Sequence, residues 1–236
     1  MKEGLDAIFF DVGDTLVFDE PSMSSRIVSA LGAIGAKASE AQIQAGLRLA
    51  EDYVLPLYVE GIDTESPEIR RQAMEAICRT AEVRMLDDSA WEAFAKAYDG
   101  VEFARRVHPE AWPLLEFLSQ QDVHLGIISD WDANLPSLLS ELGIAEFFQS
   151  FSVSELVGAH KPSAALFQHA LGYINTAPDR ALHIGDFYEL DYVGARSVGM
   201  RALLFDWRNR VPLPDVTRVA SFSELTKSIN EMFQPR

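Results

Sequence analysis

Short apolar runs that end in a polar residue or a glycine recur along the chain and predict buried strands. The first run is Ala7–Phe10, which ends at Asp11. Runs this short, with no alternation of polar and apolar positions, suit strands that are buried on both faces of a parallel sheet. The pattern predicts three further strands, at residues 123–128, 181–184 and 201–205.

Helical patterns fill the stretches between the later strands. Apolar residues recur at helical spacing over 109–120, 134–142 and 163–171, and more weakly over 189–198. Strands that alternate with helices predict βαβ units with right-handed crossovers. The fold class expected is therefore α/β, with a doubly wound, Rossmann-like parallel sheet.

The stretch from about residue 21 to residue 106 has a different character. It shows no convincing strand and is rich in Ala, Glu, Arg, Leu and Ile, which favour helix. We expect a core of residues 1–16 and 107–236, interrupted by a helical insert at 17–106 with a return linker at 100–109. The four helices expected in the insert cover residues 21–32, 39–55, 68–81 and 88–98, and Asp88-Ser89 is the expected cap of the last.

Composition limits the compartment and the class. The 236 residues are 48% hydrophobic and 24% charged, which is typical of a globular protein. No apolar run approaches the ~18 residues of a membrane span, and the first residues do not resemble a signal peptide. Cys78 is the only cysteine, so no internal disulfide can form. These features favour a cytoplasmic protein that does not act at a membrane.

The formal net charge of −16 argues against a nucleic-acid partner, because no basic stripe is present to neutralise phosphates. The charge would also repel anionic substrates at long range. Any phosphate site must therefore depend on a bound cation and on local backbone amides. The expected partner is a small molecule, and the composition defines no oligomeric state.

Chemically useful side chains follow the predicted strands or precede the predicted helices. Loops at the carboxyl ends of parallel strands share one edge of the sheet, so these side chains can converge. Mg²⁺ prefers oxygen ligands, and the sequence offers the carboxylates of Asp11 and Asp186 and the backbone carbonyl of Gly13. The interpretation rests on the set, because an Asp such as Asp11 would be an ordinary turn or helix-capping residue if it occurred alone.

The same set suggests a reaction on a phosphoryl group. Asp11 is the candidate nucleophile, since carboxylates can form an acyl phosphate. Ser129 could donate to a phosphate oxygen, and the ammonium of Lys161 could pair with Asp11 and the phosphoryl group. Asp191 could orient Lys161 or hold a metal-bound water. Taken singly, Ser129 could be a turn residue and Lys161 a solvated surface residue.

Four motifs, in order and with similar gaps, resemble those of the haloacid dehalogenase-like hydrolases. The first is Asp11–Thr15, and the helical insert that follows it resembles the cap of subfamily I. The resemblance implies a Mg²⁺-dependent hydrolase, most often a phosphatase that forms an aspartyl-phosphate on Asp11, and it places Asp130 beside Ser129 in the phosphate-binding motif. The other three motifs are Ile127–Asp130, Gly158–Pro162 and Ile184–Asp191.

The chain departs from the family pattern at Gly13. Phosphatases of the family carry there a second Asp, which protonates the leaving group and later activates water. Asp14 could take over this duty if it points into the pocket; if it points into solvent, a weak enzyme or a binding protein is favoured. Two alternatives stay open: a dehalogenase-like hydrolase, and a catalytically weak protein that binds phosphometabolites. Lys37 and Lys96, the lysines of the insert, do not fit the Schiff-base Lys of phosphonatases.

Other conspicuous residues have simpler interpretations. His124 and His183 lie within predicted buried strands and show no metal-ligand spacing, so both are expected to be core histidines. Trp131 directly follows the second motif and could either contact substrate or lie in an exposed loop. The insert carries no motif that identifies a substrate.

Overall fold

The computed structural model of the chain describes residues 4–64, 66–84, 87–208 and 216–233. The chain divides into two compact units, one made of Met1–Phe18 and Arg106–Arg236 and the other of Asp19–Arg105. The sequence placed these changes after residues 16 and 106. The first unit contains the sheet, and the second is helical.

A six-stranded sheet forms the centre of the first unit, and all its pairings are parallel. The predicted α/β class with a doubly wound sheet is confirmed. The spatial order is β5-β4-β1-β6-β7-β8. The strands are β1 (Ala7–Phe10), β4 (His124–Ser129), β5 (Ser150–Val153), β6 (Ala181–Gly185), β7 (Arg201–Phe205) and β8 (Arg218–Val219).

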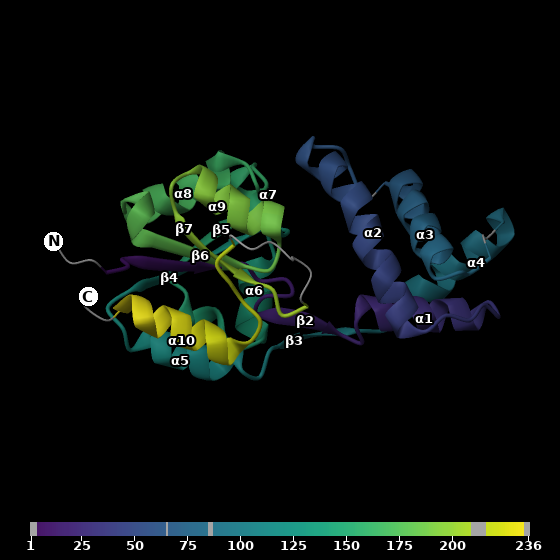
Figure 1. Cartoon of the computed structure of the whole chain (residues 1–236), viewed down its shortest axis with the longest axis horizontal. Helices are drawn as coiled ribbons and strands as arrows, with labels where there is room; N and C mark the ends of the chain where they lie inside the picture. The colour runs from purple at the N-terminus through teal and green to yellow at the C-terminus, as the bar shows by residue number, and fades with distance from the viewer. Residues whose placement is uncertain (1–3, 65, 85–86, 209–215, 234–236) are drawn as a thin grey trace. The chain divides into compact units, whose positions relative to one another are not determined.

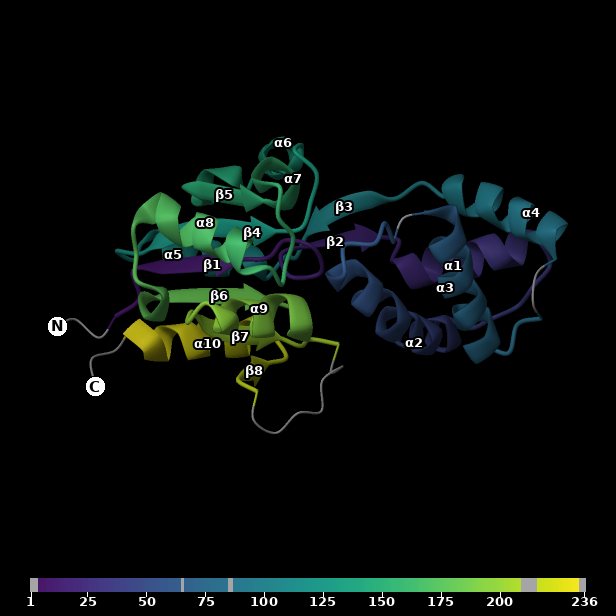
Figure 2. The ribbon, with the colours of Figure 1, turned by 90° about the horizontal axis from the view of Figure 1, so that it is seen from above.

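Strand β1 supplies apolar side chains to both faces of the sheet. Ile8 and Phe10 belong to one core cluster and Ala7 and Phe9 to the other, and all four are buried. Figures 1 and 2 show helices on both faces of the sheet. The first cluster includes residues of α5 (Ala111–Ser119), α6 (Leu135–Glu141) and α10 (Phe222–Phe233), and the second those of α8 (Ala164–Ile174) and α9 (Gly194–Ser197).

The order of the strands sets where a ligand can bind. From β1 the chain passes to β4 and then β5 on one side, and it returns to β6, β7 and β8 on the other side of β1. In open α/β sheets the ligand crevice lies outside the carboxyl ends of the strands, at the point where the strand order reverses. Asp11 directly follows β1, Ser129 ends β4, and Asp186 directly follows β6.

Several elements differ from the sequence-based expectation. β5, β8 and the two-stranded sheet of β2 (Val17–Glu20) and β3 (Ala104–Val107) were not predicted. β3 lies within the expected return linker, where no strand was foreseen, and it contains two arginines and is largely exposed. The weak helix expected at 189–198 is a π-helix, η3 (Tyr188–Val193), followed by the single turn of α9. The remaining short elements are α7 (Ser154–Val157), η1 (Ala145–Phe147) and η2 (Pro178–Arg180).

The described residues of the second unit form four helices, as the helix-favouring composition of this stretch predicts. Three of them have a serine at the N-cap, and in two of these the serine side chain accepts from a helix amide. The Ser39 cap forms a reciprocal capping box with Gln42. The fourth begins at Asp87, which accepts from the amide of Ala90 at 2.9 Å, rather than at the expected Asp88-Ser89. No helix in the described part of the chain is long and apolar enough to cross a membrane. The helices are α1 (Met23–Ala33), α2 (Glu40–Val59), α3 (Pro67–Thr80) and α4 (Asp88–Asp99).

Candidate active site

Asp11 is fixed at the carboxyl end of β1 by its backbone and by its side chain. Its amide donates to the carbonyl of Ile184 at 2.8 Å, which continues the pairing with β6. Its Oδ1 accepts from the Ser129 hydroxyl at 3.0 Å and from Lys161 Nζ at 2.6 Å. Both side-chain hydrogen bonds therefore end on the same oxygen, and among the described residues none donates to Oδ2. A buried carboxylate held by one oxygen presents the other to a ligand.

Lys161 connects two carboxylates that come from different parts of the fold, one directly after β1 and the other on the π-helix η3. Its ammonium lies 2.6 Å from Asp11 Oδ1 and 2.7 Å from Asp191 Oδ1, and the Lys161 side chain is only 4% exposed. Asp130 Oδ1 accepts from the backbone amide of Lys161 at 3.0 Å. Asp130, proposed from the sequence as a phosphate-binding residue, thus holds the loop that carries Lys161.

Asp191 lies on the π-helix η3 and is held through both carboxylate oxygens. Oδ1 accepts from Lys161 and from His183 Nε2, the latter at 2.9 Å, and Oδ2 accepts from the amide of Phe187 at 3.0 Å. The glycine at 185 makes this packing possible: a Cβ there would lie 2.2 Å from Asp191 Cγ. Because Gly185, the last residue of β6, has no side chain, the Asp191 carboxylate packs directly against the strand.

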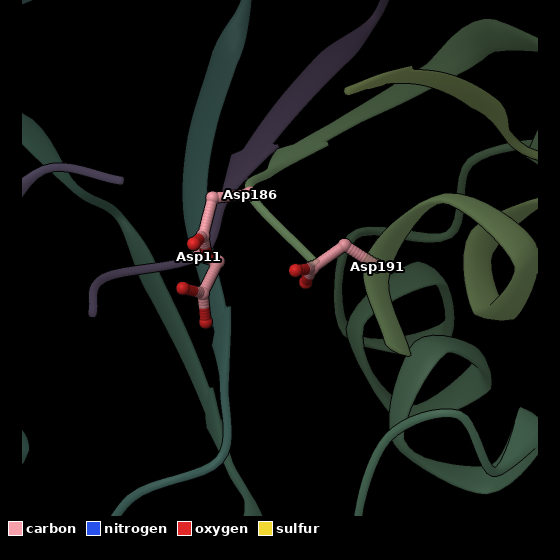
Figure 3. A group of neighbouring side chains, drawn as sticks. All are labelled: Asp11, Asp186 and Asp191. Carbon is pink, nitrogen blue, oxygen red and sulfur yellow. The ribbon is translucent and has the colours of Figure 1, made fainter. Parts of the chain in front are cut away.

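The three buried acids form a compact oxygen cluster. One carboxylate oxygen from each of Asp11, Asp186 and Asp191 lies within 4.8 Å of the others. Figure 3 shows the carboxylates of Asp11 and Asp186 next to each other where the strands end, with the Asp191 carboxylate directed toward them from the helical side. The Lys161 ammonium pairs with two of these carboxylates, those of Asp11 and Asp191. A cluster of carboxylate oxygens of this kind suits a hard cation such as Mg²⁺.

The buried charges shift one another's proton affinity. Burial raises the pKa of Asp11, although the Lys161 ammonium opposes the rise. Burial would also raise the pKa of Asp191, but Lys161 and the hydrogen bond from His183 outweigh burial and hold that pKa well below its usual range. Burial would lower the pKa of Lys161, but the charges of Asp11 and Asp191 outweigh it and raise that pKa. The cluster is therefore an ammonium fixed between acids.

Asp14 lies outside this cluster. It is in the left-handed region of the backbone, with φ 55°, and its side chain is 41% exposed and forms an ion pair with Arg208. Its backbone carbonyl accepts from the indole nitrogen of Trp207 at 2.7 Å. The turn after β1 thus sends the Asp14 carboxylate toward the loop that follows β7.

Gly13 faces an aromatic ring. A Cβ at this position would lie 3.4 Å from Cζ3 of Trp131, in ordinary van der Waals contact. The backbone of Trp131 is held by Ser154, whose hydroxyl accepts from the Trp131 amide at 3.0 Å. The ring of Trp131 therefore lies beside the position where the phosphatases resembling this chain carry their second Asp.

The structure brings together five of the residues proposed from the sequence: Asp11, Ser129, Lys161, Asp186 and Asp191. Asp14 lies apart from them. The sequence-based interpretation treated His183 only as a core residue and gave no partner for it. The signal available was its spacing: residues two apart in a strand share a face, so a histidine two positions before Gly185 shares the face on which Asp191 packs.

The chain thus has a doubly wound α/β sheet with buried carboxylates and a lysine at its carboxyl edge, where the strand order reverses and α/β proteins bind their ligands. The family model of haloacid dehalogenase-like hydrolases matches residues 5–199. The chain belongs to this family and is a hydrolase.

Among curated proteins, the human "Haloacid dehalogenase-like hydrolase domain-containing protein 3" is 36% identical over 104 residues, or 41% of each chain. The chain thus matches about two fifths of the length of that relative. "Glyceraldehyde 3-phosphate phosphatase" of Methanothermobacter thermautotrophicus is 29% identical over 210 residues, or 85% of each chain. Among solved structures, the HAD-hydrolase YfnB of Bacillus subtilis, bound to magnesium, superposes with a TM-score of 0.67 at 19% identity over 96% of this chain and 99% of that one.

Proposed function

We propose that the protein is a Mg²⁺-dependent phosphatase that hydrolyses a small organic phosphate through an aspartyl-phosphate on Asp11. The observation that carries the proposal is the ammonium of Lys161, which lies 2.6 Å from Asp11 and 2.7 Å from Asp191 within a buried cluster of acids. A fixed positive charge beside a carboxylate nucleophile suits attack on an anionic phosphoryl group.

Asp11 would react through Oδ2. This oxygen forms a bond to phosphorus while the bond between phosphorus and the oxygen of the leaving alcohol breaks. Water then attacks the phosphorus, the bond to Asp11 breaks, and inorganic phosphate is released. Ser129 and Lys161 hold Oδ1, so the side chain keeps its orientation in both steps. Lys161 also neutralises charge on the phosphoryl oxygens.

The residues that would hold Mg²⁺ are Asp11, Asp186 and the carbonyl of Gly13. Asp191 is held by Lys161, His183 and the amide of Phe187, so we assign to it the positioning of Lys161 rather than a place among the ligands. When bound, the cation reduces the repulsion between the carboxylates and the incoming phosphate. The net charge of −16 would repel an anionic substrate, so a bound cation at the site would favour phosphate binding.

The acid–base step has no side chain at the usual position, since Gly13 cannot transfer a proton. Asp14 is paired with Arg208, away from the cluster. We assign proton transfer to water, and we therefore expect slow turnover, because a positioned general acid or base contributes ~10²–10⁴-fold in rate.

Two relatives support a proposal for the substrate class. "Ribulose-1,5-bisphosphate 5-phosphatase" of Halopiger xanaduensis, 28% identical over 129 residues, and the glyceraldehyde 3-phosphate phosphatase are both named for small sugar phosphates. A phosphorylated metabolite of this size is the substrate proposed here. The helical unit is proposed to serve as the cap of the family.

The alternative of a dehalogenase-like reaction, in which Asp11 attacks carbon, is less well supported. Such a reaction needs no metal, whereas Asp186 places a second carboxylate within 4.8 Å of Asp11. A purely binding role would leave the buried nucleophile and its lysine without a chemical task.

The test is phosphate release from p-nitrophenyl phosphate and a panel of phosphometabolites that includes both sugar phosphates. Turnover is measured with Mg²⁺ and with EDTA, for the wild type and for Asp11→Asn. We expect EDTA to abolish release and Asp11→Asn to lower kcat on the order of 10³-fold or more, since the nucleophile is lost.

Asp6→Asn is the matched control, because Asp6 lies at the opposite end of the same strand and pairs with Arg180 on the surface. Its turnover should equal that of the wild type. No release from any substrate by a folded protein that binds Mg²⁺ would contradict the phosphatase proposal, and halide release from a 2-haloacid without Mg²⁺ would favour the dehalogenase reaction.

A further inference from the structure

His183 is a buried histidine whose ring meets the candidate site from inside the sheet. It lies in the middle of β6, and its side chain is 0% exposed. The ring of Phe167 from α8 packs edge-on against it, with centroids 5.4 Å apart at 83°. His183 Nε2 lies 2.9 Å from Asp191 Oδ1. The imidazole is wholly buried, and its hydrogen bond goes to a carboxylate of the candidate site. Its role is therefore not limited to packing.

The direction of this hydrogen bond follows from its surroundings. The pKa of Asp191 is held low, mainly by the charge of Lys161 against the effect of burial, so its carboxylate can only accept. His183 Nε2 therefore donates. His183 Nδ1 is buried and has no hydrogen-bond partner among the described residues, so a proton there would be an unsatisfied buried donor. The geometry favours the tautomer that carries its proton on Nε2.

The hydrogen bond from His183 ends on the same oxygen of Asp191 that pairs with Lys161. Oδ1 of Asp191 receives both His183 Nε2 and Lys161 Nζ, while Oδ2 is held by the amide of Phe187. With His183 removed, Oδ1 would keep only the lysine, and the carboxylate could rotate about the Phe187 contact. The Lys161 ammonium would then lose its fixed place 2.6 Å from Asp11.

We propose that His183 is a positioning residue, which orients Asp191 and thereby fixes Lys161 against Asp11. The inference rests on the proposed phosphatase function for its kinetic consequence. His183 contacts no reacting atom, so it acts through Asp191 alone. Outer partners that orient the groups of a metal site typically contribute ~10–100-fold in affinity or activity.

Two substitutions separate positioning from packing. His183→Leu fills a similar volume without a donor, and His183→Gln retains a terminal N–H that can reach Asp191. We expect His183→Leu to lower kcat roughly tenfold, at the lower end of the range for such partners, with KM little changed. His183→Gln should recover most of that loss. Equal kcat values for the two variants would overturn the proposal.

His124→Leu is the matched control. His124 also lies in a strand of the same sheet and also forms a 2.8 Å hydrogen bond through Nε2, but its partner is Ser150 rather than a site carboxylate. This variant should keep the wild-type kcat. A loss equal to that of His183→Leu would show that any strand histidine supports turnover only through packing, and would overturn the proposal.

A measurement without turnover separates this inference from the proposed function. Nitrogen-15 shifts of the folded protein should show a pyrrole-type Nε2 and a pyridine-type Nδ1 for His183, and Asp191→Asn should change them while His124 signals stay in place. The opposite tautomer would overturn the positioning role whatever the activity. Absence of turnover in the wild type would contradict the phosphatase proposal, and the shifts would still decide whether His183 holds Asp191.

Discussion

Asp14 shows how one backbone angle can remove a candidate catalytic group. The residue directly follows Gly13, and its positive φ of 55° turns its side chain to Arg208. Asp tolerates this region better than most residues, so the turn needs no glycine there. The Trp207 indole holds the Asp14 carbonyl at 2.7 Å, so the loop after β7 fixes the turn from outside.

Asp14→Asn therefore tests whether Asp14 performs acid–base chemistry. Its ion pair with Arg208 joins side chains that are 41% and 33% exposed, and such pairs contribute ~0–1 kcal/mol. We expect kcat to change less than about threefold in Asp14→Asn, because the carboxylate does not reach the cluster. Steady-state kinetics on the best substrate of the panel provide the measurement.

Arg208→Gln is the companion variant and should behave in the same way. A general acid or base at Asp14 would instead lower kcat ~10²–10⁴-fold in Asp14→Asn and flatten one limb of the pH profile. That outcome would replace water by Asp14 in the proposed mechanism.

At the residue scale, the sequence predicts which polar side chains lie at the carboxyl ends of the strands. Asp11, Ser129 and Asp186 each end or follow an apolar run, and parallel topology brings such positions to one edge. The direction of Asp14 and the bond from His183 to Asp191 were not accessible in the same way. A single φ decides the first, and the second depends on a contact between β6 and η3 that no periodicity encodes.

At the element scale, the packing of η3 on β6 places Asp191 in the candidate site. The π-helix Tyr188–Val193 follows β6 in the chain and packs Asp191 against that strand. Gly185 leaves the space for the carboxylate. Gly194, at the start of α9, lets the Phe167 ring approach: a Cβ there would lie 2.7 Å from Cε2. Both glycines are needed for a close approach of side chains.

Gly185→Ala should therefore damage stability and activity together. The added Cβ would lie 2.2 Å from Asp191 Cγ, so the carboxylate or the strand must shift. We expect a loss of ~1–3 kcal/mol in the free energy of unfolding, as for an overpacked core, and a fall in kcat as Asp191 leaves Lys161. Urea unfolding and kinetics on the same preparation measure the two effects.

Gly172→Ala provides the control, because Gly172 is helical and a Cβ there meets nothing within 4 Å. It should be neutral or stabilising by up to ~1 kcal/mol through helix propensity. Equal unfolding free energies for Gly185→Ala and the wild type would show that the contact between β6 and η3 is looser than the structure indicates.

The elements that sequence reasoning found and missed differ in how their burial is encoded. β1, β4, β6 and β7 are apolar runs because both of their faces are covered. β5 reads Ser-Phe-Ser-Val, and its buried serines Ser150 and Ser152 are paired with His124 and His169, so hydrophobicity alone does not mark it. β3 is an exposed strand that exists only through pairing with β2.

At the scale of the whole molecule, the chain carries a large negative charge, and the phosphate ligand proposed for the site would be an anion as well. The net charge is −16, and the buried cluster contributes three carboxylates against the one ammonium of Lys161. Salt screens the charges on the surface, whereas buried charges are screened much less. A divalent cation at the cluster should therefore stabilise the fold in a way that monovalent salt does not.

We expect Mg²⁺ to raise the melting temperature above the value in NaCl of matched ionic strength. A ligand that binds only the folded state at ~100 times its Kd contributes ~2.7 kcal/mol. For a chain of this size, each kcal/mol corresponds to a shift of ~2–4 °C. Differential scanning calorimetry over a Mg²⁺ series, with NaCl matched at every point, measures the difference.

Asp186→Asn identifies where the effect arises, because it removes a carboxylate of the cluster and leaves the bonds of Lys161 to Asp11 and Asp191 in place. The Mg²⁺-specific rise should disappear in this variant, while the response to NaCl stays the same because the rest of the surface is unchanged. An identical Mg²⁺ response in the variant and the wild type would assign the effect to surface acids and remove the cation from the site. A Mg²⁺-specific rise that depends on Asp186 would place the cation among the buried carboxylates before any substrate is known.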